Sequence, residues 1–207
     1  MVRKLTFYTN PMSRGRIARW MLEEVGADYD TVLLDYATTM KAPEYLAINP
    51  MGKVPAITHG DAVVTECAAI CAYLADAFPQ AGLAPPTDQR AAYYRWLFFA
   101  AGPLEAAITN RSLGFTPTDE QQRTAGYGNF DLTRQTLIDA LATSPYITGD
   151  TFTAADVYVG AHVGWGLEFG TMPGDPVFEA YRDRLHARPA WKRAADIDNS
   201  LMPDPMG

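Results

Sequence analysis

The sequence has little of what marks secreted, disulfide-stapled or nucleic-acid-binding proteins. Among its 207 residues only two are cysteines, Cys67 and Cys71, and two thiols four positions apart on one predicted helix form no disulfide framework. Lysine and arginine number 17 against 24 aspartates and glutamates, a formal net charge of −7. Because a phosphate backbone is bound by a basic face, we expect no nucleic-acid partner.

Long apolar runs are also missing, since no stretch approaches the ~18 residues that a membrane-spanning helix needs. The first ten residues hold too few apolar positions for a signal peptide, so we expect a cytoplasmic protein with no membrane partner. The three histidines share no metal-ligand spacing, and we expect no metal site. Hydrophobic residues are abundant, at 48%, which is enough for the core of one or two compact domains.

Residues 1–80 alternate between strand and helix patterns. A predicted strand at 5–8 precedes the segment SRGRIARWMLEEVG, whose apolar residues recur at helical spacing until Gly26 ends it. A second strand at 29–34 completes a parallel crossover unit. A helical turn at 43–48, strands at 54–58 and 62–64, and a helix at 66–77 follow. The predicted order is βαβ, α, ββα, an α/β domain.

The composition changes after this domain. The stretch FPQAGLAPPTD is rich in proline, so we predict a linker at 79–88 between a domain at 1–78 and a second domain at 89–207. No strand pattern recurs after the linker, which predicts an all-α C-terminal domain. The predicted helices are 91–108, 118–142, 153–169, 177–187 and 189–196.

Two of these predicted helices begin with a capping box. Thr118 and Gln121 open the helix at 118–142, and Thr153 and Asp156 open the helix at 153–169. We assign Asp156 to helix initiation and exclude it from the active site.

The start of the first predicted helix is the first candidate for chemistry. The leading N–H groups of a helix are unpaired and its dipole places about half a positive charge there, which favours a thiolate over a thiol. The turn Asn10-Pro11-Met12-Ser13-Arg14 has no cysteine, so a thiol at this place must belong to a ligand. Ser13 either caps the helix or donates its hydroxyl to the bound thiolate.

Two later motifs would complete such a site. A cis Val54–Pro55 bond would turn the Val54 amide and carbonyl outward as an edge for an extended peptide, whereas a trans bond would simply begin an edge strand. Glu66-Cys67 opens another helix directly after a strand, a second N-terminus that favours an anion. A thiolate site, a peptide edge and a place for an amino-acid head group together match a thiol tripeptide.

Four segments spread over nearly the whole chain carry a resemblance to a known family. They are FYTNPMSRGRIARWMLEEVG, YLAINPMGKVPAITHGD, VVTECAAICAYLADAFP and FTAADVYVGAHVGWG. In these segments the chain resembles the glutathione S-transferases of the bacterial, serine-type, theta- or beta-like kind. The resemblance implies a thioredoxin-like N-terminal domain that binds glutathione, a helical C-terminal domain that lines the pocket of the second substrate, and a homodimer.

By position, the resemblance assigns the catalytic hydroxyl to Ser13. Counted back from Gly26, the hydroxyl of several serine-type classes falls on Met12 instead, and a turn shorter by one residue restores Ser13. Tyr8 is the rival, because it lies twelve residues before Trp20, as the tyrosine of tyrosine-type members does. Its other interpretation is a strand aromatic that packs in the core.

The resemblance also implies the glutathione contacts, in addition to that of Ser13. Val54 would pair through its backbone with the cysteinyl part, Pro55 would be the cis-proline, and Lys53 would meet the glycyl carboxylate. Glu66 and Cys67 match a Glu-Ser pair that holds the γ-glutamyl end. Cys67 departs from the usual serine, and because a thiol is a poorer donor to a carboxylate, the backbone N–H of Cys67 would serve instead.

The implied function is a glutathione transferase of the detoxification type. It would activate the thiol of glutathione, its co-substrate, without a metal, for attack on small hydrophobic electrophiles. Candidate residues of the electrophile pocket are Met12, Phe99 and Trp165. Two alternatives share the thiolate site: a glutathione-dependent disulfide reductase or peroxidase, and a non-catalytic binding module of the same fold.

Overall fold

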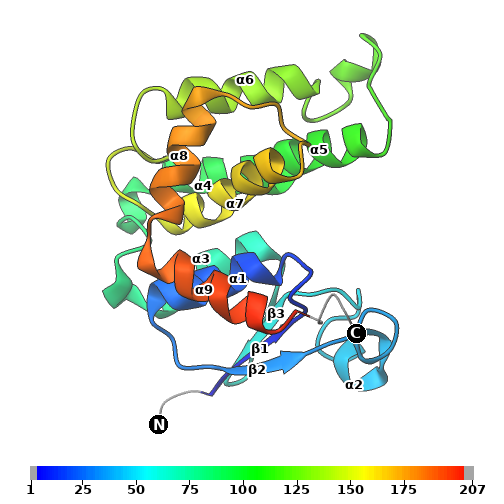
Figure 1. Ribbon diagram of the computed structural model, residues 1–207, viewed down its shortest axis with the longest axis vertical. Coiled ribbons are helices and arrows are strands. Elements are labelled where there is room, and N and C mark those ends of the chain that lie inside the picture. The colour runs from blue at the N-terminus through cyan, green and yellow to red at the C-terminus, as the bar shows by residue number, and fades with distance from the viewer. Residues whose placement is uncertain (1–3, 203–207) are drawn as a thin grey trace. The chain divides into compact units, whose positions relative to one another are not determined.

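The computed structural model describes residues 4–202, which divide into two compact units. The first unit holds the chain up to Ala81 together with the segment from Arg188 onward, and the second runs from Gly82 to Ala187. The second unit thus begins within the stretch 79–88 that the sequence indicated as a linker. The colours of Figure 1 follow the chain through both units from blue to red.

A mixed four-stranded sheet organises the first unit, as predicted. Its strands are β1 (Leu5–Thr9), β2 (Asp30–Leu33), β3 (Ala56–His59) and β4 (Ala62–Thr65), in the order β2-β1-β3-β4. β1 is parallel to β2 and antiparallel to β3, and β3 is antiparallel to β4. The register pairs Tyr8 with Ala56 and Ala56 with Thr65. The ends of β1 and β4 therefore meet the start of β3 at one end of the sheet.

Three α-helices follow the predicted βαβ, α, ββα order: α1 (Gly15–Val25), α2 (Pro43–Leu46) and α3 (Cys67–Ala77). Short 3₁₀ turns lie at Thr39–Lys41 and Pro79–Ala81. α1 ends at Gly26, whose φ of 64° is left-handed, a conformation that glycine adopts without a Cβ clash. α1 and α3 pack against each other (Figure 1).

The alternation of side chains along β1 directs helices to both faces of the sheet. Phe7 is fully buried on the α1 face, where the guanidinium of Arg19 lies 5.1 Å from the centre of its ring. Tyr8 faces the other side, where its ring lies 5.7 Å from that of Tyr45 in α2. Successive strand residues point to opposite faces, so the site at the end of β1 lies between two packed layers.

The last helix, α9 (Pro189–Ser200), packs along α1 in the first unit (Figure 1). Arg19 and Asp198 form an ion pair with 2.8 Å between Nε and Oδ1, and both side chains are 1% exposed. Arg193 pairs with Glu23 at 3.1 Å. We assigned this helix to the second domain from its helical sequence pattern. In the structure, Asp198 of α9 pairs with the buried Arg19 of α1 in the first unit.

All regular elements of the second unit are helical, as predicted. They are η3 (Thr87–Gln89), α4 (Ala91–Phe99), the π-helical segment η4 (Ala100–Leu104), α5 (Glu105–Ser112), η5 (Gln121–Arg123), α6 (Phe130–Leu141), α7 (Ala154–Glu168) and α8 (Pro176–His186). Beyond residue 90, β-pairing within the described part of the chain is an isolated bridge between Tyr146 and Gly149. Among residues 4–202, no helix is both long and apolar enough to cross a membrane.

The predicted helix at 91–108 is continuous but not α-helical throughout. The π-helical segment η4 interrupts it and contains Pro103. Proline lacks the N–H that the α-helical ladder requires, and a single wider turn accommodates it.

The prediction of a helix at 118–142 was wrong over the first half of that range. Thr118 and Gln121 do exchange the two bonds of a capping box, but the box opens only the short turn η5. Gly128, at a left-handed φ of 65°, ends this stretch, and Asn129 caps α6 by accepting a hydrogen bond from the Leu132 N–H.

Asp156 at the start of α7 has the structural role that the sequence predicted. Its carboxylate accepts hydrogen bonds from the N–H groups of Thr153 at 2.9 Å and Ile147 at 2.7 Å, and from the Tyr181 hydroxyl at 2.8 Å. Burial raises the pKa of Asp156, and these donors act in the opposite direction. The carboxylate is thus fully engaged in joining α7 to its neighbours.

The first testable consequence concerns the ion pair between α1 and α9. Asp198→Ala leaves the buried Arg19 charge uncompensated, and we expect the free energy of unfolding to fall by ~3–5 kcal/mol. Arg193→Ala removes a partly exposed pair between the same two helices, and should cost ~0.2–1 kcal/mol. Urea denaturation of both variants checks this. Losses of equal size would mean that the buried pair has no special part in holding α9.

The second consequence is a pH dependence in α8. Burial and, to a smaller extent, the Arg182 charge lower the pKa of His186 from 6.5 to about 4, and the Asp183 charge acts in the opposite direction. Between pH 6.5 and 4 the unfolded chain therefore binds this proton and the folded chain does not, so stability falls as pH drops through this window. We expect His186→Gln to lose less stability than the wild type between pH 7 and 4.5 in urea denaturation. Identical pH slopes for the two proteins would contradict this assignment.

Candidate functional site

Three segments that the sequence indicated meet at one end of the sheet of the first unit. The turn at residues 10–14 follows β1, residues 53–55 precede β3, and Glu66-Cys67 follow β4. A contact joins the starts of the two helices, since the Cys67 Sγ lies 3.5 Å from the Arg14 carbonyl oxygen. The topology therefore brings the three predicted motifs together.

The start of α1 lies unusually close to the end of β1. A Cβ at Gly15 would be 1.9 Å from the Thr9 Oγ1, so only glycine fits there. Asn10 fixes the turn between them: its side-chain amide donates to the Leu34 carbonyl at 2.8 Å, and its Oδ1 accepts from the Met12 N–H at 2.9 Å. The first turn of α1 is consequently held directly above the end of the strand.

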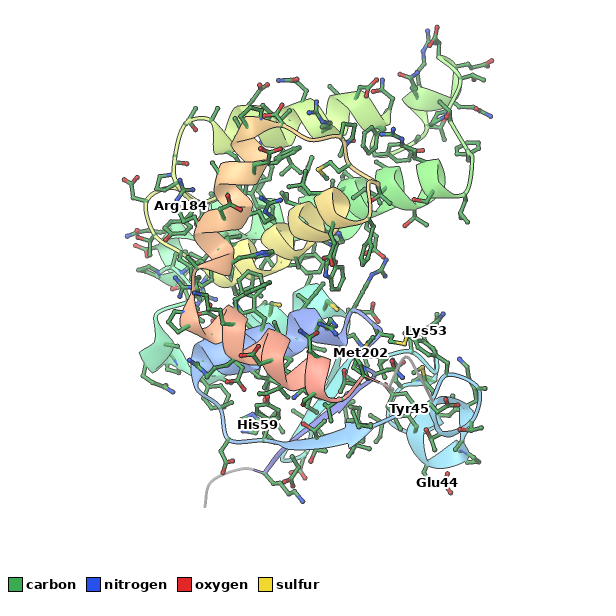
Figure 2. All side chains as sticks on the ribbon, viewed as in Figure 1. Glu44, Tyr45, Lys53, His59, Arg184 and Met202 are labelled. Carbon is green, nitrogen blue, oxygen red and sulfur yellow. The ribbon has the colours of Figure 1, made fainter. Side chains whose placement is uncertain are left out.

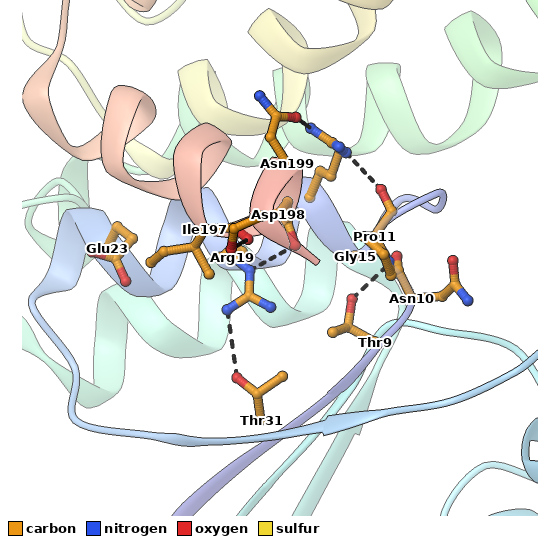
Figure 3. Close-up of polar contacts among 12 residues, drawn as sticks. Thr9, Asn10, Pro11, Gly15, Arg19, Glu23, Thr31, Ile197, Asp198 and Asn199 are labelled. Carbon is orange, nitrogen blue, oxygen red and sulfur yellow. Dashed lines mark hydrogen bonds and ion pairs between the residues drawn. The ribbon is translucent and has the colours of Figure 1, made fainter. Parts of the chain in front are cut away.

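Three successive carbonyl groups of this turn each accept a hydrogen bond. The Asn10 carbonyl accepts from the Ser13 hydroxyl at 2.6 Å. The Pro11 carbonyl accepts from Nε of Arg16 at 2.6 Å, and the Met12 carbonyl accepts from the Tyr36 hydroxyl at 3.0 Å. Figure 3 shows this turn beside α1 and α9. Because its acceptors are engaged, the turn repels an anion less than free carbonyls would.

The Ser13 hydroxyl is engaged in the turn just before α1, whose N-cap residue is Arg14. Its Oγ accepts from the Gly15 N–H at 2.9 Å and donates to the Asn10 carbonyl. The side chain is half-buried, and the Ser13 N–H has no hydrogen-bond partner within residues 4–202. The Ser13 N–H is thus available to a ligand. The Ser13 hydroxyl becomes available only when it gives up its hydrogen bond to the Asn10 carbonyl.

Tyr8 and Met12, the other two candidates for this position, are placed differently. Tyr8 is half-buried, and its ring packs on Tyr45 on the face of the sheet opposite α1. Met12 is 62% exposed, and its backbone rather than its side chain holds the turn. The packing of Tyr8 agrees with its interpretation as a strand aromatic.

The second segment contains a cis Val54–Pro55 peptide bond. The Lys53 side chain is exposed (Figure 2). The Lys53 carbonyl accepts from the Tyr45 hydroxyl and from the Asn49 amide. Within residues 4–202, the N–H and the carbonyl of Val54 have no partner in the chain. This short piece of backbone is available to pair with an extended ligand.

The third segment combines an exposed carboxylate with a buried thiol. Glu66 has a φ of 67° and is the one residue other than glycine at positive φ in the described part of the chain. Cys67 is 7% exposed and directs its Sγ at the Arg14 carbonyl. The thiol therefore holds the two helix starts together, and the Cys67 N–H is the group that opens α3.

The electrophile-pocket candidates belong to different units. Met12 lies in the first unit, whereas Phe99 and Trp165 lie in the second, where both are half-buried. Phe99 packs edge-on against Trp96, with 5.2 Å between ring centres. Among the described residues, no group of three or more histidine, cysteine, aspartate or glutamate side chains could hold a metal ion.

Sequence reasoning missed Arg16 and Tyr36 as parts of this site. Both act on backbone carbonyls of the turn, and a contact of this kind leaves no pattern in the spacing of residues. The one available signal was the position of Arg16 within the first turn of the predicted helix.

Fold and site together define a thioredoxin-like domain that presents a helix start in place of its own cysteine, joined to a helical unit. Residues 3–76 match the family described as "Glutathione S-transferase, N-terminal domain". Glutathione S-transferase GstA of Escherichia coli O157:H7 is 30% identical over 179 residues, which cover 81% of this chain and 86% of that protein. The chain belongs to the glutathione S-transferase family.

Solved structures agree with this assignment. A glutathione transferase from Methylococcus capsulatus strain Bath is 28% identical with a TM-score of 0.77, over 95% of this chain and 99% of that one. A sphingomonad glutathione S-transferase in complex with glutathione is also 28% identical, with a TM-score of 0.76 over 94% and 98% of the two chains.

The backbone of Glu66 generates the third prediction. A residue with a side chain at this sparsely populated φ is strained by ~1–3 kcal/mol, and glycine relieves the strain. We expect Glu66→Gly to be ~1 kcal/mol more stable than Glu66→Ala, which keeps the Cβ. Thermal or urea unfolding of the two variants, which both lack the carboxylate, measures the difference. Equal stabilities would show that the backbone at Glu66 is relaxed.

Proposed function

We propose that this chain binds glutathione at the end of the sheet of its first unit and lowers the pKa of the glutathione thiol. The thiolate would then attack small hydrophobic electrophiles. The observation that best supports this is the turn at residues 10–13, where three carbonyls are engaged and the Ser13 N–H remains available. A helix start in this state stabilises an anion.

The other two segments would hold the rest of the tripeptide. The N–H and carbonyl of Val54, ahead of cis-Pro55, offer an edge that pairs with the cysteinyl backbone. The exposed Lys53 ammonium would meet the glycyl carboxylate. Glu66 and the N–H of Cys67 at the start of α3 would hold the charged γ-glutamyl end. Because the Cys67 thiol is directed at Arg14, its backbone rather than its side chain would make this contact.

The energies required are within reach of these groups. A cysteine thiol has a reference pKa of ~8.5, and lowering it by two units requires ~2.7 kcal/mol of preference for the anion. A hydrogen bond to a charged group supplies ~1.5–3 kcal/mol, and a helix N-terminus ~0.3–1 kcal/mol. One donated hydrogen bond and the start of α1 therefore suffice.

The Ser13 hydroxyl would take part by exchanging its acceptor. In the structure it donates to the neutral Asn10 carbonyl. A hydrogen bond to an anion is about twice as strong as one between neutral groups, so a thiolate nearby favours rotation of the hydroxyl towards sulfur. This rotation releases the Asn10 carbonyl, whereas the Pro11 and Met12 carbonyls stay engaged by Arg16 and Tyr36. The thiol proton passes to water, the sulfur lone pair forms the new S–C bond, and the leaving group departs with its bonding pair.

The remaining parts of the proposal follow from membership of the family. We propose that two copies of the chain form a homodimer in the cytoplasm, with a domain boundary in the stretch 79–88. We further propose that Met12, Phe99 and Trp165 contact the hydrophobic acceptor, in keeping with a role in detoxification.

The fourth prediction tests the donor. Ser13→Ala removes the hydroxyl but keeps the Ser13 N–H, and we expect kcat with a chloronitrobenzene-type acceptor to fall ~10–100-fold, which corresponds to ~1.5–3 kcal/mol. Ser13→Thr keeps a hydroxyl and should stay within a few-fold of wild type. Tyr8→Phe should also change the rate only a few-fold, because Tyr8 packs on Tyr45. Steady-state kinetics at saturating glutathione measures all three.

Other outcomes have clear meanings. A large loss in Tyr8→Phe with an active Ser13→Ala would assign the donor role to Tyr8. If neither change affects the rate, the backbone N–H groups alone activate the thiol. Wild-type turnover of a small mixed disulfide, with none on the chloronitrobenzene, would contradict the transferase proposal. Retention on a glutathione column without either activity would instead indicate a binding module.

A further inference from the structure

One side chain connects the candidate thiol site with the last helix of the chain. Arg16 donates through Nε to the Pro11 carbonyl at 2.6 Å and through Nη1 to the side-chain carbonyl of Asn199 in α9 at 2.9 Å. Figure 3 draws both bonds as dashed lines, one ending on Pro11 and the other on Asn199. Two segments at opposite ends of the sequence therefore share a single half-buried guanidinium.

The position of Asn199 is itself fixed. The residue directly before it, Asp198, is buried in its ion pair with Arg19 of α1. α9 therefore cannot slide along α1 without breaking a buried charged pair, which is costly. The backbone at Asn199 is therefore held in place, and its exposed side-chain carbonyl accepts from the Arg16 guanidinium.

The bond from Arg16 bears directly on an anion at the turn. The Pro11 carbonyl stands between two others that are held by the Ser13 and Tyr36 hydroxyls. A carbonyl released from its donor can turn its negative end towards a bound thiolate, and this would raise the thiol pKa. Arg16 also adds a positive charge beside the first turn of α1.

We propose that Arg16 is a positioning residue for the thiol site and that Asn199 sets its orientation, so that the last helix of the chain holds the turn at residues 10–13 in the form that stabilises a bound thiolate. This inference rests on the proposed function. Other charged groups at this end of the unit are Arg14 just before α1, Lys53, Glu66 and the Arg19–Asp198 pair, and the variants below leave all of them in place.

The fifth prediction compares variants along this connection. In Arg16→Ala we expect kcat at pH 7 to fall 5–30-fold and the midpoint of the pH–rate profile to rise by about one to two units. In Asn199→Ala, which keeps the Arg16 charge, the loss should be two- to fivefold with a shift in the same direction. Arg16→Lys keeps a charge but not the rigid fork that reaches two acceptors, and should lose at least threefold. Binding of S-methylglutathione, which has no thiol, should change less than threefold in all of them.

Arg193→Ala is the matched control, because it removes an ion pair between α9 and α1 that is remote from the turn. It should leave kcat and the pH profile unchanged. The inference is wrong if Arg193→Ala shifts the pH midpoint as Arg16→Ala does, because loosened packing of α9 would then explain the effect. It is also wrong if Arg16→Ala keeps both rate and midpoint.

Hydrogen exchange separates this inference from the proposed function. The N–H groups of Met12 and Gly15 are both bonded within the turn. We expect them to exchange at least threefold faster in Arg16→Ala and Asn199→Ala, but not in Arg193→Ala. If the wild type neither acidifies glutathione nor turns over, the proposed function fails, and faster exchange would still show that Arg16 holds the turn. Unchanged exchange in both variants would overturn the inference whatever the activity.

Discussion

A single buried guanidinium determines how the first unit is assembled. Arg19 of α1 lies over the ring of Phe7 in β1, bonds the Tyr29 hydroxyl at 3.2 Å and pairs with Asp198 of α9. A buried charge separated from its partner is strongly destabilising. The helix α1 can therefore lie only where β1 and α9 both contact the Arg19 side chain. The start of α1, one turn earlier, consequently has one position relative to the end of β1.

The proposed function depends on that fixed helix start. Gly15 allows α1 to begin against Thr9, and the carbonyls of Asn10, Pro11 and Met12 in the turn before it are bonded by side chains. The donors are Ser13, Arg16 and Tyr36. What remains at the turn is the Ser13 N–H together with the positive charge of Arg16 and of the helix start, an environment that favours a thiolate. In the proposed function the protein needs no cysteine of its own there, because glutathione brings the thiol.

The features that the sequence predicted correctly are those that interactions between neighbouring residues determine. The order βαβ, α, ββα, the left-handed stop at Gly26 and the capping role of Asp156 could all be read from the sequence, since each depends on neighbouring residues. The place of α9 could not, because it depends on Arg19 and Asp198, which are 179 positions apart. The break before α6 was missed because the capping box at Thr118 is typical of a helix start. The positive φ of Gly128, which ends that short stretch, is seen only in the structure. At the candidate site, the motifs came from the sequence, but the orientation of the Ser13 hydroxyl is set by the Asn10 carbonyl.

The central claim is that the start of α1 makes a bound thiol acidic. The most direct test is to titrate the thiolate absorbance of glutathione bound to the wild-type protein, against S-methylglutathione as the blank. The account predicts a midpoint about two units below the reference of ~8.5, so that most of the bound thiol is ionised at pH 7. A midpoint that stays near ~8.5 with the site saturated would contradict it.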